Sequence, residues 1–393
     1  MISETCIAPV NIAVIKYWGK RDEELILPIN SSLSMTLSTD QMCAKTTAAA
    51  SATFKENRMW LNGEEVPFEG NPRMQKCLDA LKRLAEAEKS KRFPLEWKLH
   101  ICSENNFPTA AGLASSAAGY ACLVYTLANL YGVEKSELSS IARQGSGSAC
   151  RSIYGGFVEW VAGIKNDGSD SIAIQVQPAL HWPEMRVLIL VVNDSRKKTS
   201  STNGMLNSVN TSDLIKHRAN VCVPQRILQI KEAIARKDFK TFGEITMRDS
   251  NQFHAICLDT YPPCAYMNDT SHAIVNFIHQ YNETRGDVKV AYTFDAGPNA
   301  CLYLLEEEVA NVLSLLNKVF PNDNSENSEY VKGIPIDLQK VRPASELYNQ
   351  EIVPVGNNLL KYIIHTKAGE GPQKLLDPED SLVDDAGMPK KLK

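Results

Sequence analysis

Short stretches of alternating hydrophobic and polar positions along the chain predict β-strands. Residues 7–15 alternate loosely and end at the run Lys-Tyr-Trp-Gly-Lys, residues 16–20, which predicts a strand that enters a functional loop. Residues 97–101 alternate cleanly and predict a second strand. Residues 187–192 are apolar at every position, which is typical of a strand buried on both faces.

A long apolar stretch in the first half of the chain predicts a buried helix. The turn-forming residues 105–108 precede a run of small residues, 112–116, which opens the apolar stretch. Gly132 lies just beyond the stretch, where a helix commonly ends in a left-handed residue. The pattern therefore predicts a strand, a loop and then a helix that ends near Tyr131.

Two further strands and a domain boundary are predicted in the second half. Residues 288–294 and 301–305 are apolar and are joined by a turn, so Asp295, the first turn residue, is expected at the rim of a sheet. The proline-containing segment 181–184 precedes the buried strand, and we place the boundary there, which gives domains of residues 1–183 and 184–393. The tail after Gly371 is rich in charge and proline and is expected to be mobile or to lie on the surface.

Composition and charge place the chain among ordinary globular proteins. Its 393 residues exceed the usual size of one core, and 44% of them are hydrophobic and 22% charged. A net charge of −4 gives no general attraction to nucleic acid or to an acidic membrane, so anion binding requires local clusters of Lys and Arg. The first 20 residues resemble neither a signal peptide nor a membrane span, which predicts a cytoplasmic location.

The cysteines and histidines do not form recognisable metal-binding patterns. The ten cysteines contain no C-x-x-C pair, which favours reduced, mostly buried thiols over a disulfide framework or a zinc site. His254 lies with Asp249 and Asp259 in a polar region, but none of the seven histidines has the spacing of metal ligands. We interpret the histidines as core or surface residues and expect no structural metal.

Residues 108–117 are the first candidate for binding an anion. They combine small side chains, which let backbone N–H groups approach phosphate oxygens, with two hydroxyls at the start of the predicted helix. The helix dipole there favours an anion by about 0.3–1 kcal/mol. Ser115 or Ser116 then caps the helix, binds phosphate or holds magnesium. The alternative is an ordinary N-cap, and the segment is not a Walker-type loop.

Residues 143–151 are the second candidate, predicted as a loop. Gly145 and Gly147 permit unusual backbone angles, and Ser146 and Ser148 supply hydroxyl donors. Arg151 offers a planar fork that suits a carboxylate or a phosphate. The alternative is a flexible surface turn with a solvated arginine.

Further charged residues extend this picture. Cations stand at Lys16, Lys20, Arg73 and residues 196–198, and each could be solvated surface. Together they suggest a ligand with more than one phosphate. Asp295 is the acidic candidate, either as a catalytic carboxylate or as a residue whose side chain stabilises its own turn.

Four segments, in this order and spacing, resemble the mevalonate diphosphate decarboxylase family of the GHMP kinase superfamily. They are residues 8–20, 108–117, 146–151 and 292–300, and the likeness extends to about residue 373. GHMP sugar and mevalonate kinases usually carry a Gly-Glu-His-type first motif, whereas this chain has Lys-Tyr-Trp-Gly-Lys. The resemblance implies an α+β fold, with an N-terminal α/β domain that binds ATP and phosphate and contains a left-handed βαβ crossover, and a ferredoxin-like C-terminal domain. It places the active site in the cleft between them.

The resemblance also implies an activity. This is ATP- and magnesium-dependent decarboxylation of (R)-5-diphosphomevalonate to isopentenyl diphosphate, with release of ADP, phosphate and CO2, as in isoprenoid and sterol precursor synthesis. A homodimer is implied as well. Two alternatives remain, a GHMP-type small-molecule kinase that does not decarboxylate and a non-catalytic nucleotide-binding module. The presence of Asp295, Lys16 and Arg151 together argues against the binding module.

The family motifs assign roles to particular residues. By resemblance, Asp295 lies against the substrate 3-hydroxyl as a base or orienting carboxylate, Arg151 grips the substrate carboxylate, and Lys16 lies near Asp295 and the transferring phosphoryl group. The other implied substrate contacts are Asn11, Tyr17, Trp18, Gly19, Lys20, Arg73, Ser146, Gly147, Ser148, Ala149, Cys150, Ser201 and Thr202. The implied ATP contacts are Ser103, Asn105, Ala111, Gly112, Ser115 and Ser116, with Ser116 also on magnesium. Residues 200–205, predicted as a loop, are where the family varies.

Overall fold

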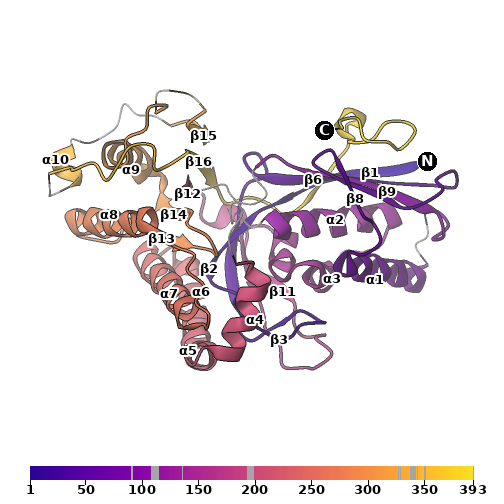
Figure 1. Cartoon of the computed structure of the whole chain (residues 1–393), viewed down its shortest axis with the longest axis horizontal. Coiled ribbons are helices and arrows are strands. Elements are labelled where there is room, and N and C mark those ends of the chain that lie inside the picture. The colour runs from indigo at the N-terminus through magenta and orange to yellow at the C-terminus, as the bar shows by residue number, and fades with distance from the viewer. Residues whose placement is uncertain are drawn as a thin grey trace.

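The protein combines several β-sheets with helices packed against them (Figure 1). The computed structural model describes residues 1–89, 92–107, 115–134, 136–192, 199–325, 327, 329–336, 342, 344–348 and 351–392. Within these ranges the strands form sheets of six, four, five and two strands. The predicted α+β class is confirmed. None of the helices within the described ranges is long and apolar enough to cross a membrane.

The largest sheet has the strand order β17-β1-β6-β9-β7-β8. Its strands are β1 (Ile2–Pro9), β6 (Cys43–Ser51), β7 (Arg58–Leu61), β8 (Glu64–Val66), β9 (Lys98–Asn105) and β17 (Gln373–Leu375). One face is covered by α2 (Ser115–Tyr131), which packs against β1 and β6. Helices α1 (Pro72–Glu88) and α3 (Leu138–Gly145) pack against α2 (Figure 1). The predicted helix is confirmed as α2, and Gly132 beyond it has a φ of 76°.

The strand predicted at residues 7–15 is in fact two strands in different sheets. β1 ends at Pro9, and β2 (Asn11–Ile15) belongs to a second sheet of order β11-β10-β5-β2. The other strands of this sheet are β5 (Ser32–Thr36), β10 (Phe157–Trp160) and β11 (Ala173–Gln177). Proline has no N–H to donate to a ladder, so the pairing of β1 stops at Pro9 and the chain changes sheet at the next residue.

The third sheet has the order β13-β14-β12-β16-β15. Its strands are β12 (Met185–Val191), β13 (Val290–Phe294), β14 (Ala300–Leu305), β15 (Val331–Gly333) and β16 (Tyr362–Lys367). The strands predicted at residues 187–192, 288–294 and 301–305 are confirmed as β12, β13 and β14. All residues of β12, the central strand, are buried, which explains its continuous apolar sequence.

Helix α7 holds the second and third sheets together. This helix, Phe239–Asp259, packs against both β13 and β2. The hydroxyl of Tyr303, on β14, also donates to the carbonyl of Ile12, on β2, at 3.0 Å. The helices of this half are α4 (Ser201–Thr211), α5 (Leu214–His217), α6 (Val223–Arg236), α7 (Phe239–Asp259), α8 (Asp269–Arg285), α9 (Glu306–Val319) and α10 (Ala344–Leu347). Short elements are β3 (Lys20–Asp22), β4 (Leu27–Pro28), η1 (Gly147–Ile153), η2 (Ala179–His181), η3 (Arg218–Cys222) and η5 (Pro378–Asp380).

Two segments predicted as loops are helical. Residues 143–151 contain the end of α3 and the 3₁₀ helix η1, and α4 begins at Ser201 because Ser200 caps it, accepting from the N–H of Asn203 at 3.2 Å. Gly145 and Gly147, which were expected to permit unusual backbone angles, do not have a positive φ. The lack of a side chain at Gly145 serves close packing instead, since a Cβ would lie 2.2 Å from the ring of Tyr120.

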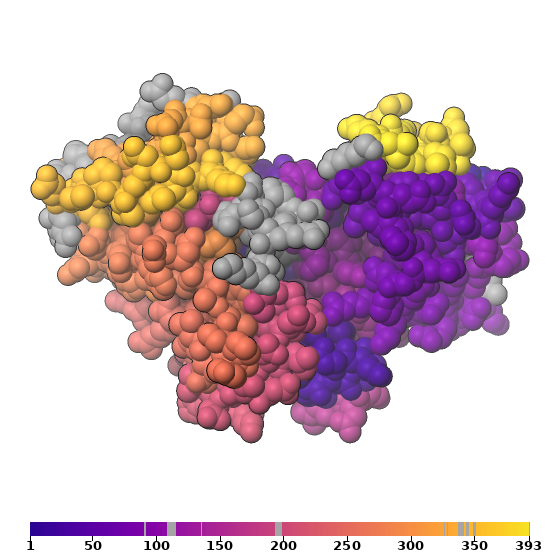
Figure 2. Space-filling view, viewed as in Figure 1, coloured from indigo at the N-terminus to yellow at the C-terminus, as the bar shows by residue number. Residues whose placement is uncertain are grey.

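The end of the chain returns to the first sheet. β17 pairs with β1, and the following residues cover the sheet face opposite α2, where Val383 packs against Trp60 and Cys102 (Figures 1 and 2). His100 Nδ1 lies 2.8 Å from the carbonyl oxygen of Gly387. Of the two alternatives for the tail, lying on the surface is the one observed. The division into residues 1–183 and 184–393 stays a prediction, and the tail lies with the first of these parts.

Candidate active site

An ion pair joins two segments that are far apart in the sequence. Lys16 follows β2 and Asp295 follows β13, and the Nζ of Lys16 lies 2.6 Å from Oδ1 of Asp295. The lysine side chain is 3% exposed, whereas the aspartate side chain is 29% exposed. The pair therefore has a buried cation and a carboxylate that a ligand can reach.

Arg151 is almost fully buried and lies close enough to Asp295 for their charges to interact. Its guanidinium, in η1, donates to the hydroxyl of Ser34 at 2.9 Å, to the hydroxyl of Ser32 at 2.5 Å and to the side-chain oxygen of Asn11 at 3.3 Å. Burial lowers the pKa of Arg151, and the carboxylate of Asp295 opposes this shift. The alternative of a solvated arginine in a surface turn is wrong, since Arg151 is 2% exposed.

The hydrogen-bond partners of Arg151 among the described residues are neutral. Cys150 beside it has a pKa raised by burial to about 12 and is therefore a neutral thiol at pH 7. The amide of Asn11, which accepts from Arg151, donates to the carbonyl of Ser148 at 3.0 Å and to the hydroxyl of Ser152 at 2.7 Å, and so fixes η1 against β2. A buried guanidinium held only by neutral groups is suited to binding an anion.

Tyr17 presents a second buried polar group. Its ring packs against Trp160 with a centroid distance of 4.7 Å, and its hydroxyl has no hydrogen-bond partner among the described residues. Burial raises the pKa of Tyr17, while the positive charges of Arg73 and Arg151 lower it. Gly147 allows the close approach of this ring, because a Cβ there would lie 2.8 Å from Tyr17. The phenol is therefore an unused donor among charged groups of both signs, the carboxylate of Glu23 as well as Arg73 and Arg151.

The two candidate anion-binding segments meet. Ser116, in the first turn of α2, and Ser146, which precedes η1, bring their hydroxyl oxygens within 3.3 Å of each other. Ser116 is exposed and Ser115 is half-buried. Ala111 and Gly112 lie outside the described residues, as do the cations at residues 196–198. The start of α2 and the start of η1 thus offer hydroxyls to the same place.

Two of the predicted contact residues, Trp18 and Lys20, have side-chain partners within the protein. The indole of Trp18 packs against Phe253 and Tyr266 and donates to the hydroxyl of Ser208 at 2.8 Å, so it forms part of a small core. Lys20 is buried and pairs with Glu23 at 2.6 Å. Between them, Gly19 has a φ of 92°, a conformation that favours glycine.

The remaining predicted residues lie on the surrounding elements. Arg73 is half-buried in the first turn of α1, and Ser201 and Thr202 are half-buried in the first turn of α4. Ser103 and Asn105 lie near the end of β9, where the hydroxyl of Ser103 is 3.0 Å from that of Thr46. Ala149 and Cys150 are fully buried in η1.

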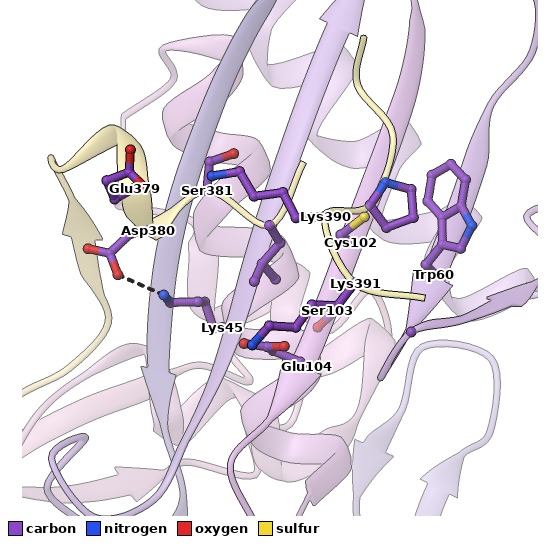
Figure 3. Close-up of a pocket in the computed structure, with 13 residues that line it drawn as sticks. Lys45, Trp60, Cys102, Ser103, Glu104, Glu379, Asp380, Ser381, Lys390 and Lys391 are labelled. Carbon is purple, nitrogen blue, oxygen red and sulfur yellow. Dashed lines mark hydrogen bonds and ion pairs between the residues drawn. The ribbon is translucent and has the colours of Figure 1, made fainter. Parts of the chain in front are cut away.

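A small cavity of about 160 Å³ lies elsewhere, between the first sheet and the C-terminal tail (Figure 3). Its charged lining is mixed, since Lys45 pairs with Asp380 at 2.7 Å. Ser103 contributes to the lining, but Lys16, Asp295 and Arg151 do not. The cavity is therefore separate from the ion pair and its neighbours.

Comparisons with known proteins show the family to which the chain belongs. The family model of the diphosphomevalonate decarboxylase-like N-terminal domain matches residues 8–173, and that of the mevalonate 5-diphosphate decarboxylase C-terminal domain matches residues 187–375. The diphosphomevalonate decarboxylases of Bos taurus and Homo sapiens are each 53% identical over 395 residues, which covers 98% of this chain and 97% of each relative. The chain belongs to the mevalonate diphosphate decarboxylase family.

Solved structures of mevalonate diphosphate decarboxylases have the same fold. An X-ray structure of mevalonate 5-diphosphate decarboxylase is 44% identical with a TM-score of 0.84, and covers 98% of this chain and 99% of its own. The enzyme from Trypanosoma brucei is 36% identical with a TM-score of 0.87, covering 98% and 100%. A third structure, 31% identical with a TM-score of 0.73 and covering 96% and 99%, is a complex with MVAPP, AMPPCP and magnesium.

Sequence reasoning missed the residues that bind Arg151 and the backbone of Lys16 in this member of the mevalonate diphosphate decarboxylase family. Ser32 and Ser34 alternate with Leu33 and Met35 along β5, and all four are fully buried, so one face of a buried strand is lined with hydroxyls. Asp249 stands at a core position of α7, in helical register with Phe242 and Phe253. The sequence did contain a signal for them. The period of the strand or helix predicts an apolar residue at each of these positions, and a charged or hydroxyl residue stands there instead.

His254 is a neutral neighbour of the ion pair. Its Nε2 lies 3.4 Å from the carbonyl oxygen of Phe294, and the ring is 8% exposed. Burial and the positive charge of Lys16 lower the pKa of His254 to about 4. Histidine in a core position was one of the two interpretations from sequence, and the structure supports it over a surface position.

Proposed function

We propose that the protein catalyses the ATP-dependent decarboxylation of (R)-5-diphosphomevalonate to isopentenyl diphosphate, with release of ADP, phosphate and CO2. The observation that carries this proposal is the pairing of Lys16 with the partly exposed Asp295 at 2.6 Å, beside the buried guanidinium of Arg151. Membership of the decarboxylase family supports the same activity. The reaction supplies a precursor for isoprenoid and sterol synthesis.

Asp295 is proposed to act on the 3-hydroxyl of the substrate. A positioned carboxylate that accepts or orients a proton contributes about 10²–10⁴ in rate. The ammonium of Lys16 touches the same carboxylate and is placed to offset negative charge on the phosphoryl group as it transfers. Once the tertiary hydroxyl carries a phosphate, that phosphate can leave with the electrons of its C–O bond. The C–C bond to the carboxylate then breaks to release CO2, and its electron pair forms the alkene.

Arg151 is proposed to hold the substrate carboxylate. Its guanidinium is already oriented by neutral oxygens of Asn11, Ser32 and Ser34 and lacks an acidic hydrogen-bond partner among the described residues. An arginine fork binds a carboxylate through two parallel hydrogen bonds, which fixes the direction of the bond to be broken. The unpartnered hydroxyl of Tyr17 adds a donor for the diphosphate end.

ATP and magnesium are proposed to bind at the start of α2. A magnesium ion keeps several waters and takes most other ligands from phosphates, so it needs few protein donors. The exposed hydroxyl of Ser116, at a helix N-terminus and 3.3 Å from Ser146, fits that requirement. When bound, magnesium neutralises charge on the nucleotide phosphates. Ser103, Asn105, Ser115 and the segment with Ala111 and Gly112 are the proposed ATP contacts.

The remaining substrate contacts and the cellular context are proposals of the same kind. Lys20, Arg73 and the first turn of α4, with Ser201 and Thr202, are proposed to bind the diphosphate. Trp18 and Gly19 are proposed to shape the turn that carries Lys16 and Tyr17. We further propose that the protein acts in the cytoplasm as a homodimer.

The activity is tested by incubating purified protein with ATP, magnesium and mevalonate diphosphate and measuring CO2, ADP and inorganic phosphate. The proposal predicts equal amounts of all three products. Formation of ADP and a stable phosphorylated product without CO2 would instead establish a GHMP-type kinase. Nucleotide binding without any product would indicate a binding module.

A further inference from the structure

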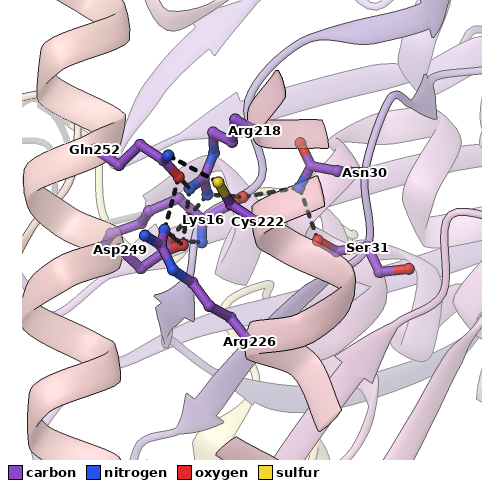
Figure 4. Close-up of polar contacts among 8 residues, drawn as sticks. All are labelled: Lys16, Asn30, Ser31, Arg218, Cys222, Arg226, Asp249 and Gln252. Atoms are coloured by element: carbon purple, nitrogen blue, oxygen red, sulfur yellow. Dashed lines mark hydrogen bonds and ion pairs between the residues drawn. The ribbon is translucent and has the colours of Figure 1, made fainter. Parts of the chain in front are cut away.

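The backbone of Lys16 is bound by a buried network of side chains from other parts of the chain (Figure 4). Arg218, in η3, and Asp249, in α7, are both 0% exposed. They pair through two contacts, Arg218 Nη1 to Asp249 Oδ1 at 2.7 Å and Arg218 Nη2 to Asp249 Oδ2 at 2.9 Å. Burial raises the pKa of Asp249, but the guanidinium of Arg218 outweighs this and the pKa lies below its ordinary value.

The network binds both backbone polar groups of Lys16. The Lys16 N–H donates to Oδ2 of Asp249 at 2.8 Å, and its carbonyl accepts from Nη2 of Arg218 at 3.0 Å. The same carbonyl accepts from the side-chain amide of Asn30 at 3.1 Å. Lys16 lies just past the last residue of β2, so side chains rather than strand pairing fix its backbone.

Stability alone does not account for this arrangement. Removing two charges from water is costly, and a buried ion pair is often no more stabilising than apolar side chains of similar volume. The pair fixes the orientation of the Lys16 backbone. Asp249 binds the peptide unit before Lys16, and Arg218 binds the peptide unit after it. At the other end of that residue, the ammonium reaches Asp295.

We propose that Asp249 and Arg218 are positioning residues that clamp the backbone of Lys16 so that its ammonium faces Asp295. This inference rests on the proposed function, in which Lys16 and Asp295 act at the reacting oxygen. A displacement of about 1 Å in such a group costs about 10²-fold in rate. The clamp acts through Lys16 and does not touch the substrate.

Arg226 provides a matched control. Its Nη1 binds Oδ1 of Asp249 at 2.9 Å and Oε1 of Gln252 at 2.7 Å, whereas the contacts to Lys16 come from Oδ2 of Asp249 and from Arg218. Arg218→Met and Arg226→Met each remove one guanidinium from the same carboxylate. Only the first also removes a donor from the carbonyl of Lys16, which then keeps the amide of Asn30 as its remaining partner in this network.

The test compares steady-state kinetics of the two variants in the full-length protein, with thermal unfolding as the check on folding. Arg218→Met is expected to lower kcat about 10²-fold while KM for ATP and for mevalonate diphosphate change little. Arg226→Met is expected to keep kcat within a few-fold of the unmodified protein. Because Arg218→Met breaks a buried ion pair, Arg218→Lys serves as a second variant that keeps a cation beside Asp249 but cannot span both partners.

A double variant separates positioning from general damage. If Arg218 acts through Lys16, then Lys16→Met with Arg218→Lys has the same kcat as Lys16→Met alone. The proposal would be overturned if the reductions in kcat of the two single variants multiplied in the double variant. It would also be overturned if Arg218→Lys had a normal kcat. If Lys16→Met itself leaves kcat unchanged, the proposed function of the ion pair fails instead, so the two failures are distinguishable.

Discussion

Arg151 carries a full charge in a buried position, and its neighbours account for how it is tolerated there. Hydroxyls of Ser32 and Ser34 and the amide of Asn11 satisfy its donors, so the guanidinium is fixed without being neutralised. Burying an unpaired charge is costly, and the cost is recovered when an anion arrives. The side chain is thus oriented before the substrate carboxylate binds.

Arg151→Gln is expected to weaken the use of mevalonate diphosphate without affecting ATP. Truncating one partner of a buried charge pair costs about 2–5 kcal/mol, so kcat/KM for mevalonate diphosphate should fall about 30- to 5,000-fold. Steady-state kinetics with each substrate varied in turn check this, with KM for ATP as the internal control. A loss confined to ATP affinity would show that Arg151 contacts the nucleotide and not the substrate carboxylate.

His254 is expected to make stability depend on pH. Its pKa is about 4 in the folded protein and near 6.5 when unfolded, so below pH 6.5 the unfolded state binds the extra proton. The stabilisation is complete above pH 6.5 and declines as the pH falls toward 4, by about 2 kcal/mol between pH 7 and pH 5. Chemical denaturation at the two pH values should show a smaller decline in His254→Gln. The exposed His217→Gln should behave like the unmodified protein, and equal declines in all three would contradict the assignment.

The elements show where sequence patterns were sufficient and where they were not. The strands β12, β13 and β14 and the helix α2 were predictable because each is a run of apolar residues that spans most of the element. β1 and β2 were fused in the prediction, since the alternation continues past Pro9 although the pairing partners change. The 3₁₀ helix η1 was predicted as a loop because of its Gly and Ser content, but its glycine serves close packing.

Gly147→Ala tests the packing role of η1. The added methyl would lie 2.8 Å from the ring of Tyr17 and 3.0 Å from Trp160, so overpacking should lower the free energy of unfolding by about 1–3 kcal/mol. Gly119→Ala, in α2, meets nothing within 4 Å and is expected to be neutral or stabilising, since alanine favours a helix. Chemical denaturation compares the two variants. Equal effects would mean that η1 is as adaptable as a surface turn.

At the scale of the whole molecule, the site exists only because distant parts of the chain meet. Motifs around residues 16, 151 and 295 were recognisable in the sequence, but their meeting depends on α7 packing against both β2 and β13. The helical register of Asp249 could have indicated a buried charge, but its pairing with Arg218 and Lys16 could not be predicted, because the backbone that both bind is 200 or more positions away. Such long-range pairing is a property of the packed fold rather than of any local pattern.

Asp295→Asn is the most direct test of the central claim. With ATP, magnesium and mevalonate diphosphate labelled in the carboxyl group, release of labelled CO2 should fall by about 10²–10⁴-fold, because the amide cannot act as a base and no longer pairs with Lys16. Calorimetry should show that nucleotide and mevalonate diphosphate still bind. Release of labelled CO2 at nearly the rate of the unmodified protein would contradict the assignment of Asp295 and of the site built around it.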